Sequence, residues 1–402
     1  MMKMQGEKQV NRLAFFFAAT YMVSYITRIN YGAVLSEMES ATQMSKSLLG
    51  MAPTGSFITY GVGQIISGIC GDQYSPKKLV FYGLTVTTLM NLLIPLCQNP
   101  YQMLVVWCIN GFAQAFLWPP LVRLMTALLS DDDYKKAMVK VLWGSSLGTI
   151  VVYLISPLLI STLGWKSVFV FSAICGVVMV IVWNKYAYEI QSGQKKTVSS
   201  RKGPDISLFT SLMICIMLAI ICMGMLRDGI TTWMPSYISE TYHLNSSISI
   251  LTGVLLPIFG IICFQIASRL YRKTFTNPLL CAGVIFAAGT SAALGLFLFS
   301  EQNVVFSVLF SAALTGCMHG VNLMLISMIP PFFQKRGNVS TVSGVLNSCT
   351  YIGSALSTYG IALLSERLGW KYTLFTWILI GAAGTMLCLI SVRPWDRDFK
   401  AE

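Results

Sequence analysis

Apolar stretches of about twenty residues recur along the whole chain, and they limit its possible folds more than any other feature. Such a stretch is long enough to cross the ~30 Å hydrocarbon core of a bilayer as a helix. Only 11% of the residues are charged, against roughly 25% in a soluble domain. The sequence predicts an all-α membrane protein of twelve transmembrane helices, at 12–35, 48–70, 78–97, 101–128, 138–161, 166–187, 207–237, 247–270, 277–299, 303–331, 338–364 and 371–393.

The placement of the basic residues explains why the chain has a net charge of +12. With an even number of spans both termini share one side of the membrane, and 21 of the 28 Lys and Arg residues fall on that side. Because basic residues accumulate in cytoplasmic loops, we expect cytoplasmic termini and a place in the plasma (inner) membrane, with the lipid bilayer as partner and no nucleic acid. The eleven cysteines show neither disulfide-framework nor zinc spacing, so we expect no metal and no cofactor.

The two halves of the chain repeat several features. Gly164 to Lys166 and Gly369 to Lys371 both read Gly-Trp-Lys, at an offset of 369 − 164 = 205. Arg28 and Arg227 are offset by 227 − 28 = 199. The longest polar segment lies between the halves and reads as a flexible linker. The expected parts are an N-terminal six-helix bundle (1–188), a cytoplasmic linker (189–205) and a C-terminal six-helix bundle (206–402).

Arg28 and Arg227 each lie inside a long apolar stretch that opens one half of the chain. A charged side chain at this depth costs about 2.5–3.5 kcal/mol on insertion scales, and such residues usually face a polar interior. One cation in each half therefore suggests a cavity that holds an anion. The alternative is that each arginine pairs with backbone carbonyls or with an acid such as Asp228.

Five short segments carry a family resemblance: Arg28-Ile29-Asn30, the loop Gly68–Lys78 with Asp72, Trp118–Met125, Leu226–Tyr237 and Tyr351–Ser354. They resemble the major facilitator superfamily and, within it, the organophosphate:phosphate antiporters, which include glycerol-3-phosphate and hexose-phosphate transporters. The resemblance implies two pseudo-symmetric six-helix bundles (the major facilitator fold) with the substrate between them. It also implies that Arg28 and Arg227 bind the phosphoryl group of the substrate.

The chemistry of arginine agrees with that role. A phosphate monoester carries about −1.5 to −2 charges near neutral pH, and the guanidinium fork matches its oxygens bidentately. An anion that bridges two moving halves favours exchange, because an empty site with two cations resists closure. We therefore expect rocker-switch exchange of a phosphate ester, such as a sugar or polyol phosphate, for inorganic phosphate by a monomeric transporter.

Further candidate residues have one functional and one structural interpretation each. His319 either donates to the substrate or carries a proton, or it is a satisfied core histidine. Tyr351 either lines the cavity or packs. Asp228 is expected to point away from Arg227, about 100° further around the helix, as a packing partner or a proton carrier. Weaker candidates for substrate contact are Asn30, Trp118, Trp143, Trp233 and Asn347.

Two residues are expected to act on conformation. Asp72 is expected to accept hydrogen bonds at the N-terminus of a neighbouring helix, and Arg123 to bond helix ends or the facing loop rather than the substrate.

The chain departs from the family at four positions. Trp143 lies in the segment where the glycerol-3-phosphate branch has a histidine, Gln64 replaces a lysine, Ile29 replaces a basic residue, and Asp228 stands where an aromatic usually follows the arginine. The site therefore carries less positive potential, and glycerol-3-phosphate specificity does not transfer.

Two other functions remain open. One is proton-coupled symport of a carboxylate such as a sugar acid, with His319 or Asp228 carrying the proton. The other is a transporter-like membrane sensor that binds an organic phosphate and signals to a kinase. We expect no enzymatic activity, since the sequence has no HExxH, no CxxC and no phosphate-cradling glycine loop.

Overall fold

The computed structural model describes residues 6–44, 46–190, 210–243, 255–299 and 303–399, and every regular element among them is helical. The first half of the chain contains α1 (Glu7–Ala33), α2 (Leu35–Thr42), α3 (Lys46–Gln73), α4 (Pro76–Leu93), η1 (Ile94–Leu96), α5 (Pro100–Gln114), α6 (Trp118–Leu128), α7 (Asp131–Leu163) and α8 (Lys166–Tyr186). The second half contains α9 (Ser211–Tyr242), α11 (Leu255–Lys273), α12 (Pro278–Phe299), α13 (Val304–Asn322), η3 (Leu323–Ser327), η4 (Pro330–Arg336), α14 (Val339–Leu368) and α15 (Trp370–Phe399).

Each of the twelve predicted spans corresponds to one of these helices or to consecutive shorter ones, while residues 207–209 and 247–254 of the seventh and eighth spans lie outside the described residues. Nine helical segments among the described residues are long and apolar enough to cross a membrane. The helices α1, α3 and α14 are not among the nine, although they have 27, 28 and 30 residues. The reason is chemical: they carry Arg28, Gln64 and Tyr351, together with many serines, threonines and glycines. Candidate site residues thus lie both on these three less apolar helices and on apolar ones such as α9 and α13.

The chain divides into two compact units, which are described separately here. The first unit comprises Met1–Ser199 and Pro330–Ser348, and the second comprises Ser200–Ile329 and Cys349–Glu402. The segment Pro330–Ser348, with the start of α14, belongs to the first unit, which the sequence did not lead us to expect. Most of the predicted linker lies outside the described residues, so the division at 189–205 stays a prediction.

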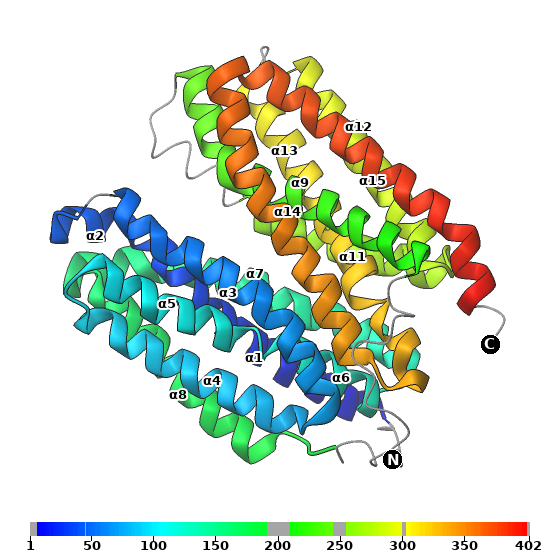
Figure 1. Cartoon of the computed structure of the whole chain (residues 1–402), viewed down its shortest axis with the longest axis horizontal. Coiled ribbons are helices and arrows are strands. Elements are labelled where there is room, and N and C mark those ends of the chain that lie inside the picture. The colour runs from blue at the N-terminus through cyan, green and yellow to red at the C-terminus, as the bar shows by residue number, and fades with distance from the viewer. Residues whose placement is uncertain (1–5, 45, 191–209, 244–254, 300–302, 400–402) are drawn as a thin grey trace. The chain divides into compact units, whose positions relative to one another are not determined.

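In the first unit, α1 packs along α7, α3 along α5, and α4 along α8 (Figure 1). The contact between α1 and α7 is close because α7 carries glycine where the helices meet. A Cβ atom at Gly148 would lie 2.6 Å from the carbonyl oxygen of Met22 and 2.8 Å from Cβ of Tyr25. Small residues at a helix interface let the two backbones approach in this way.

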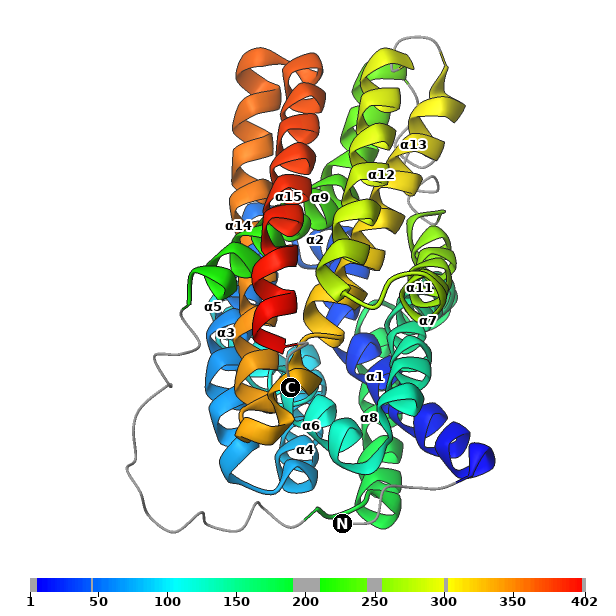
Figure 2. The same ribbon diagram turned by 90° about the vertical axis from the view of Figure 1, so that its right-hand side faces the viewer.

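The second unit repeats this contact at equivalent residues. Its helices α12 and α13 run side by side, with α15 along α12 and α11 along α13 (Figure 2). A Cβ atom at Gly353 on α14 would collide with the carbonyl oxygen of Ile221 on α9. Gly353 follows Gly148 by 353 − 148 = 205 residues, and Ile221 follows Met22 by 221 − 22 = 199. These are the two offsets of the sequence repeat, so both units hold their first long helix in the same way.

The repeated Gly-Trp-Lys segments have a structural cause. Gly164 and Gly369 have φ of 78° and 82°, a left-handed conformation that ends α7 and α14 and that glycine adopts without strain. The tryptophan that follows each glycine packs against an aromatic ring, from the start of α8 in the first unit and from the last turns of α9 in the second. The Trp165 ring lies 5.9 Å from that of Phe169, and the Trp370 ring lies 5.3 Å from that of Tyr237.

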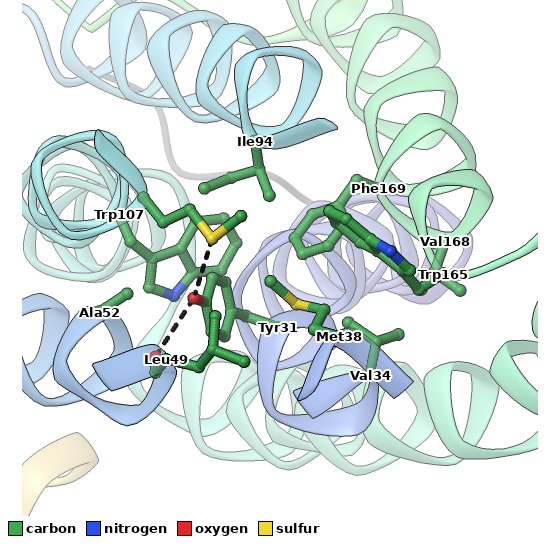
Figure 3. Packing of buried hydrophobic residues seen from close by; sticks show 11 residues of the cluster. Tyr31, Val34, Met38, Leu49, Ala52, Ile94, Trp107, Trp165, Val168 and Phe169 are labelled. Carbon is green, nitrogen blue, oxygen red and sulfur yellow. Dashed lines mark hydrogen bonds between the residues drawn. The ribbon is translucent and has the colours of Figure 1, made fainter. Parts of the chain in front are cut away.

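Trp165 belongs to a buried cluster at one end of the first unit (Figure 3). Tyr31 lies at its centre and is fully buried. The Tyr31 hydroxyl donates to the carbonyl oxygen of Leu49 at 3.2 Å and contacts Sδ of Met103 at 3.7 Å. This cluster fixes the end of α1 that follows Arg28, and it therefore restricts the position of the arginine along the unit.

We predict that Gly353→Ala destabilises the protein by about 1–3 kcal/mol, because the added methyl group must push α14 away from the Ile221 carbonyl. Gly360 on the same helix provides a matched control, since a Cβ there meets no described atom within 4 Å. Gly360→Ala should be neutral or stabilising by up to ~1 kcal/mol. Thermal unfolding of the purified protein, followed by tryptophan fluorescence, measures both. Equal midpoints for the two variants would contradict the close contact.

Candidate functional site

Arg28 lies on α1 between two aromatic rings. Its guanidinium carbon is 4.2 Å from the ring centroid of Tyr25, on the same helix, and 4.9 Å from that of Tyr60 on α3. A guanidinium over an aromatic face is stabilised by roughly 0.5–2 kcal/mol, depending on its desolvation. Two such rings offset a large part of the free-energy cost of placing Arg28 inside an apolar helix.

The aromatic rings continue from Arg28 toward α6. Tyr21, Tyr25 and Arg28 follow each other at steps of four and three residues, so they share one face of α1. The Tyr21 ring lies 5.1 Å from that of Tyr25 and 4.8 Å from that of Trp118. Trp118 was expected from the sequence, whereas Tyr21 and Tyr25 were not. Their helical spacing from Arg28 is the signal that could have identified them.

A break between α5 and α6 positions Trp118. Pro119 and Pro120 have no backbone N–H, so the carbonyl oxygens four residues earlier lose their usual helical partners. The side chain of Gln64 compensates for one of them, since its Nε2 donates to the carbonyl oxygen of Ala115 at 3.3 Å. Gln64 is fully buried, and its Oε1 accepts no hydrogen bond from any described residue.

Two buried indole groups of the first unit also lack partners. The Nε1 atoms of Trp118 and Trp143 make no hydrogen bond within the described part of the structure. An indole N–H only donates, and a buried donor without an acceptor costs about 1–3 kcal/mol. These N–H groups, in the same unit as Arg28, are suited to the oxygens of a ligand. Gln64 and Trp143 are two of the positions at which the chain departs from the family pattern.

Asn30 does not share this arrangement. It is fully buried, and its Nδ2 donates to Asn91 Oδ1 at 2.7 Å and to Ser172 Oγ at 2.9 Å. Its Oδ1 accepts from the backbone N–H of Tyr31. We therefore place Asn30 in the framework that holds α1 and leave it out of the proposed ligand contacts.

Three amides missed by the sequence analysis complete this framework. Asn91 and Asn110 donate to the carbonyl oxygen of Thr27 at 2.9 Å and 3.3 Å. Gln114 donates to the carbonyl oxygen of Ser24 at 3.0 Å and to the Thr27 hydroxyl at 2.9 Å. These bonds fix the rotation of α1 one turn before Arg28. These three residues could have been identified from the sequence as isolated amide side chains inside apolar spans.

In the second unit, Arg227 on α9 forms an ion pair with its neighbour Asp228. The Nε–Oδ1 distance is 2.7 Å and the Nη2–Oδ2 distance is 2.9 Å, so the contact is bidentate. The expectation that Asp228 points away from Arg227 was wrong. The 100° step describes where the side chains leave the helix, whereas the long arginine side chain curls back to reach the adjacent carboxylate. The two side chains are 16% and 29% exposed.

Ser354 and His319 surround this ion pair. The Ser354 hydroxyl on α14 bonds Oδ2 of Asp228. His319 on α13 is close enough to interact electrostatically with both Arg227 and Asp228, and its ring packs against that of Phe264 at 5.3 Å. The pair cancels its own charge, so this cluster is neutral as long as His319 is neutral.

The other candidates of α9 and α14 lie in different settings. The Trp233 Nε1 is buried and makes no hydrogen bond with the described residues. Tyr351 is partly exposed, one turn of α14 before Ser354. Asn347 is buried and belongs to the first unit. Their role in ligand contact stays a prediction.

Asp72 and Arg123 form the contacts expected from the sequence. The Asp72 oxygens accept the backbone N–H groups of Ser340 at 2.9 Å and Thr341 at 2.7 Å, in the first turn of α14. Arg123 donates through Nη1 to the carbonyl oxygens of Gly71 and Tyr74. All of these residues belong to the first unit. Their conformational role stays a prediction.

Two helical units with equivalent internal contacts, each with an arginine in its first long helix, define a polytopic membrane transporter of the two-bundle class. The sequence model of the Major Facilitator Superfamily matches residues 17–358. The chain belongs to this superfamily.

Comparison with known proteins extends this assignment. The membrane sensor protein UhpC of Salmonella typhimurium is 24% identical, over 92% of this chain and 88% of that protein. A probable hexose phosphate transport protein of Chlamydia muridarum is 21% identical, over 87% and 84%. The solved proton:xylose symporter XylE has the same fold, with a TM-score of 0.74 at 12% identity over 98% of this chain and 96% of that one. The predicted resemblance to the organophosphate:phosphate antiporter family is confirmed.

We predict that Trp118→Phe leaves thermal stability unchanged or slightly higher, because phenylalanine keeps the ring and removes a buried donor without a partner. If that N–H contacts the ligand, affinity for inorganic phosphate should fall about five- to tenfold, equivalent to roughly 1–1.4 kcal/mol. Phosphate-dependent thermal shifts measure both quantities.

Trp377→Phe is the matched control. The Trp377 Nε1 on α15 is also buried without a described partner, but this residue is not a site candidate. Its substitution should leave phosphate affinity unchanged. Equal affinities in wild type and Trp118→Phe would remove Trp118 from the site.

Proposed function

We propose that this protein moves an organic anion across the plasma membrane by rocker-switch alternating access, exchanging a phosphate ester for inorganic phosphate. The observation that carries the proposal is Arg28, a guanidinium that lies against two aromatic rings, in a unit whose buried indole N–H groups of Trp118 and Trp143 make no hydrogen bond to the described residues. This combination suits a tetrahedral oxyanion attached to a carbon skeleton. The guanidinium and the indole N–H groups suit the phosphoryl oxygens, and the aromatic rings suit the remainder of the ligand.

The repeat supports a common task for the two arginines. Arg28 lies 28 − 22 = 6 residues beyond Met22, the residue that Gly148 contacts, and Arg227 lies 227 − 221 = 6 residues beyond Ile221, the residue that Gly353 contacts. Each unit thus presents its arginine at the same place on its first long helix. We propose that both arginines bind the same anion, as the family resemblance implies, with both chain termini in the cytoplasm.

The ion pair of Arg227 with Asp228 bears on how the substrate binds. An anion that takes the Nε and Nη2 donors of Arg227 has to displace the carboxylate of Asp228. We favour a sugar or polyol phosphate, because a relative of similar length is named a probable hexose phosphate transport protein.

Two other functions have specific support. The Arg227–Asp228 pair beside His319 favours proton-coupled symport of a carboxylate such as a sugar acid. Similarity to a protein named a membrane sensor favours a receptor that binds an organic phosphate without net transport.

We predict that proteoliposomes loaded with inorganic phosphate take up labelled hexose 6-phosphate or phosphate, and that unloaded vesicles do not. Exchange requires a counter-substrate inside, so uptake should persist when a protonophore removes the pH gradient. Uptake that needs the pH gradient and ignores internal phosphate would establish symport. Ligand binding without uptake in either case would establish the sensor.

We predict that Arg28→Lys and Arg227→Lys each weaken phosphate binding about 10–100-fold, or roughly 1.4–2.7 kcal/mol, since an ammonium group cannot reproduce the guanidinium fork. If both arginines hold one anion, the double variant should lose less than the sum of the two, because residues that share a partner are not additive. Phosphate-dependent thermal shifts give the three affinities.

Arg397→Lys is the control for these three variants, since Arg397 lies on α15 with a side chain that is 79% exposed. It should bind phosphate as wild type does. Additive losses in the double variant would mean that the two arginines act on different ligands or at separate steps.

A further inference from the structure

The carboxylate of Asp228 occupies the side of Arg227 on which an anionic ligand would bind. It engages Nε and Nη2 at 2.7 Å and 2.9 Å, the two parallel donors that a guanidinium offers to a carboxylate or a phosphoryl group. An anion that binds these donors has to replace Asp228. The second unit thus contains an internal competitor for its own arginine.

The Ser354 hydroxyl can form a hydrogen bond with Asp228 whether the Asp228 carboxyl group is ionised or protonated. Its oxygen contacts Oδ2 of Asp228 and also lies 2.9 Å from the carbonyl oxygen of Thr350. A hydroxyl has one proton to donate and two lone pairs that accept. With Asp228 ionised, Ser354 donates to the carboxylate. With Asp228 protonated, Ser354 donates to Thr350 and accepts from the carboxyl group, so the contact survives protonation without movement of α14.

The groups around Asp228 come from each helix that packs on this part of α9. Arg227 lies on α9 itself, His319 on α13 acts on Asp228 electrostatically, and α14 contributes the Ser354 hydroxyl. The η3 segment contains no charged residue. Among the described residues of α15, Cys388 is the titratable group that interacts electrostatically with α9, and its partner there is Cys222. Arg227 is therefore the main cation that keeps Asp228 ionised.

We propose that Asp228 couples anion binding to proton uptake. The incoming anion takes the Nε and Nη2 donors of Arg227, and the displaced carboxylate binds one proton from water while it keeps its hydrogen bond to Ser354. One O–H bond forms on the carboxyl group, and one O–H bond of the hydronium ion that supplies the proton breaks and leaves water. A buried carboxyl group that has lost its cation is neutral, which drives this step. The inference rests on the proposed function, because it needs an anion that binds Arg227.

Calorimetry of inorganic phosphate binding at pH 7, in two buffers with different ionisation enthalpies, counts the protons taken up per bound anion. Wild type should take up about one proton more than Asp228→Asn, because the amide cannot titrate. Asp228→Asn should also bind phosphate about tenfold more tightly, since Arg227 no longer has a competing carboxylate. Equal proton counts in the two proteins, with phosphate bound by both, would overturn the inference and leave the proposed function intact.

The chain offers a matched control in the exposed pair Arg397–Asp398 on α15. It has the same order in the sequence, with an Nε–Oδ1 distance of 2.9 Å. Asp398→Asn removes the same charge from the same unit. This variant should take up as many protons per bound phosphate as wild type and bind phosphate with the same affinity.

Infrared difference spectra of wild type test the inference even if Asp228→Asn does not fold. Phosphate binding should produce the C=O band of a newly protonated carboxyl group in wild type and in Asp398→Asn. Absence of this band while phosphate binds would overturn the inference. Failure of wild type to bind phosphate or a phosphate ester by calorimetry would instead overturn the proposed function, and the inference with it.

Discussion

The structure depends on the cost of keeping a guanidinium ionised inside an apolar helix. In this protein two different environments offset that free-energy cost. Arg28 lies against the rings of Tyr25 and Tyr60, whose faces stabilise a positive charge. Arg227 is paired with Asp228, which cancels the charge. Equivalent positions of the repeat thus stabilise their guanidinium groups differently, one with aromatic rings and the other with a carboxylate.

The framework around each arginine consists mainly of neutral polar contacts. Amides of Asn91, Asn110 and Gln114 bond the backbone and side chains of α1 just before Arg28, and Gln64 replaces a donor that proline removes from α5 and α6. Such bonds hold a helix without adding charge that would compete with Arg28 for a ligand.

Much of the fold could be predicted from the sequence because membrane crossing imposes a length and an apolar composition. The twelve spans follow from that constraint, and the Gly-Trp-Lys repeat marked the two units through glycines whose φ is positive. The contacts within the site were less accessible. The prediction for Asp228 failed because helical periodicity fixes the direction of Cβ and says little about where a long side chain ends. Tyr21 and Tyr25 were missed because tyrosines in apolar helices usually only pack, and their proximity to Trp118 depends on a helix break.

The close contacts of Gly148 and Gly353 have a consequence for how such a chain tolerates insertions. Each arginine lies six residues, or about 9 Å of helix, beyond the carbonyl on which the neighbouring glycine rests. One extra apolar residue within either interval would keep the hydrophobicity of the helix and the glycine contact. It would nevertheless turn the guanidinium by about 100° around the helix axis, away from its aromatic rings or its carboxylate. These two intervals are therefore the parts of the chain in which length matters more than residue identity.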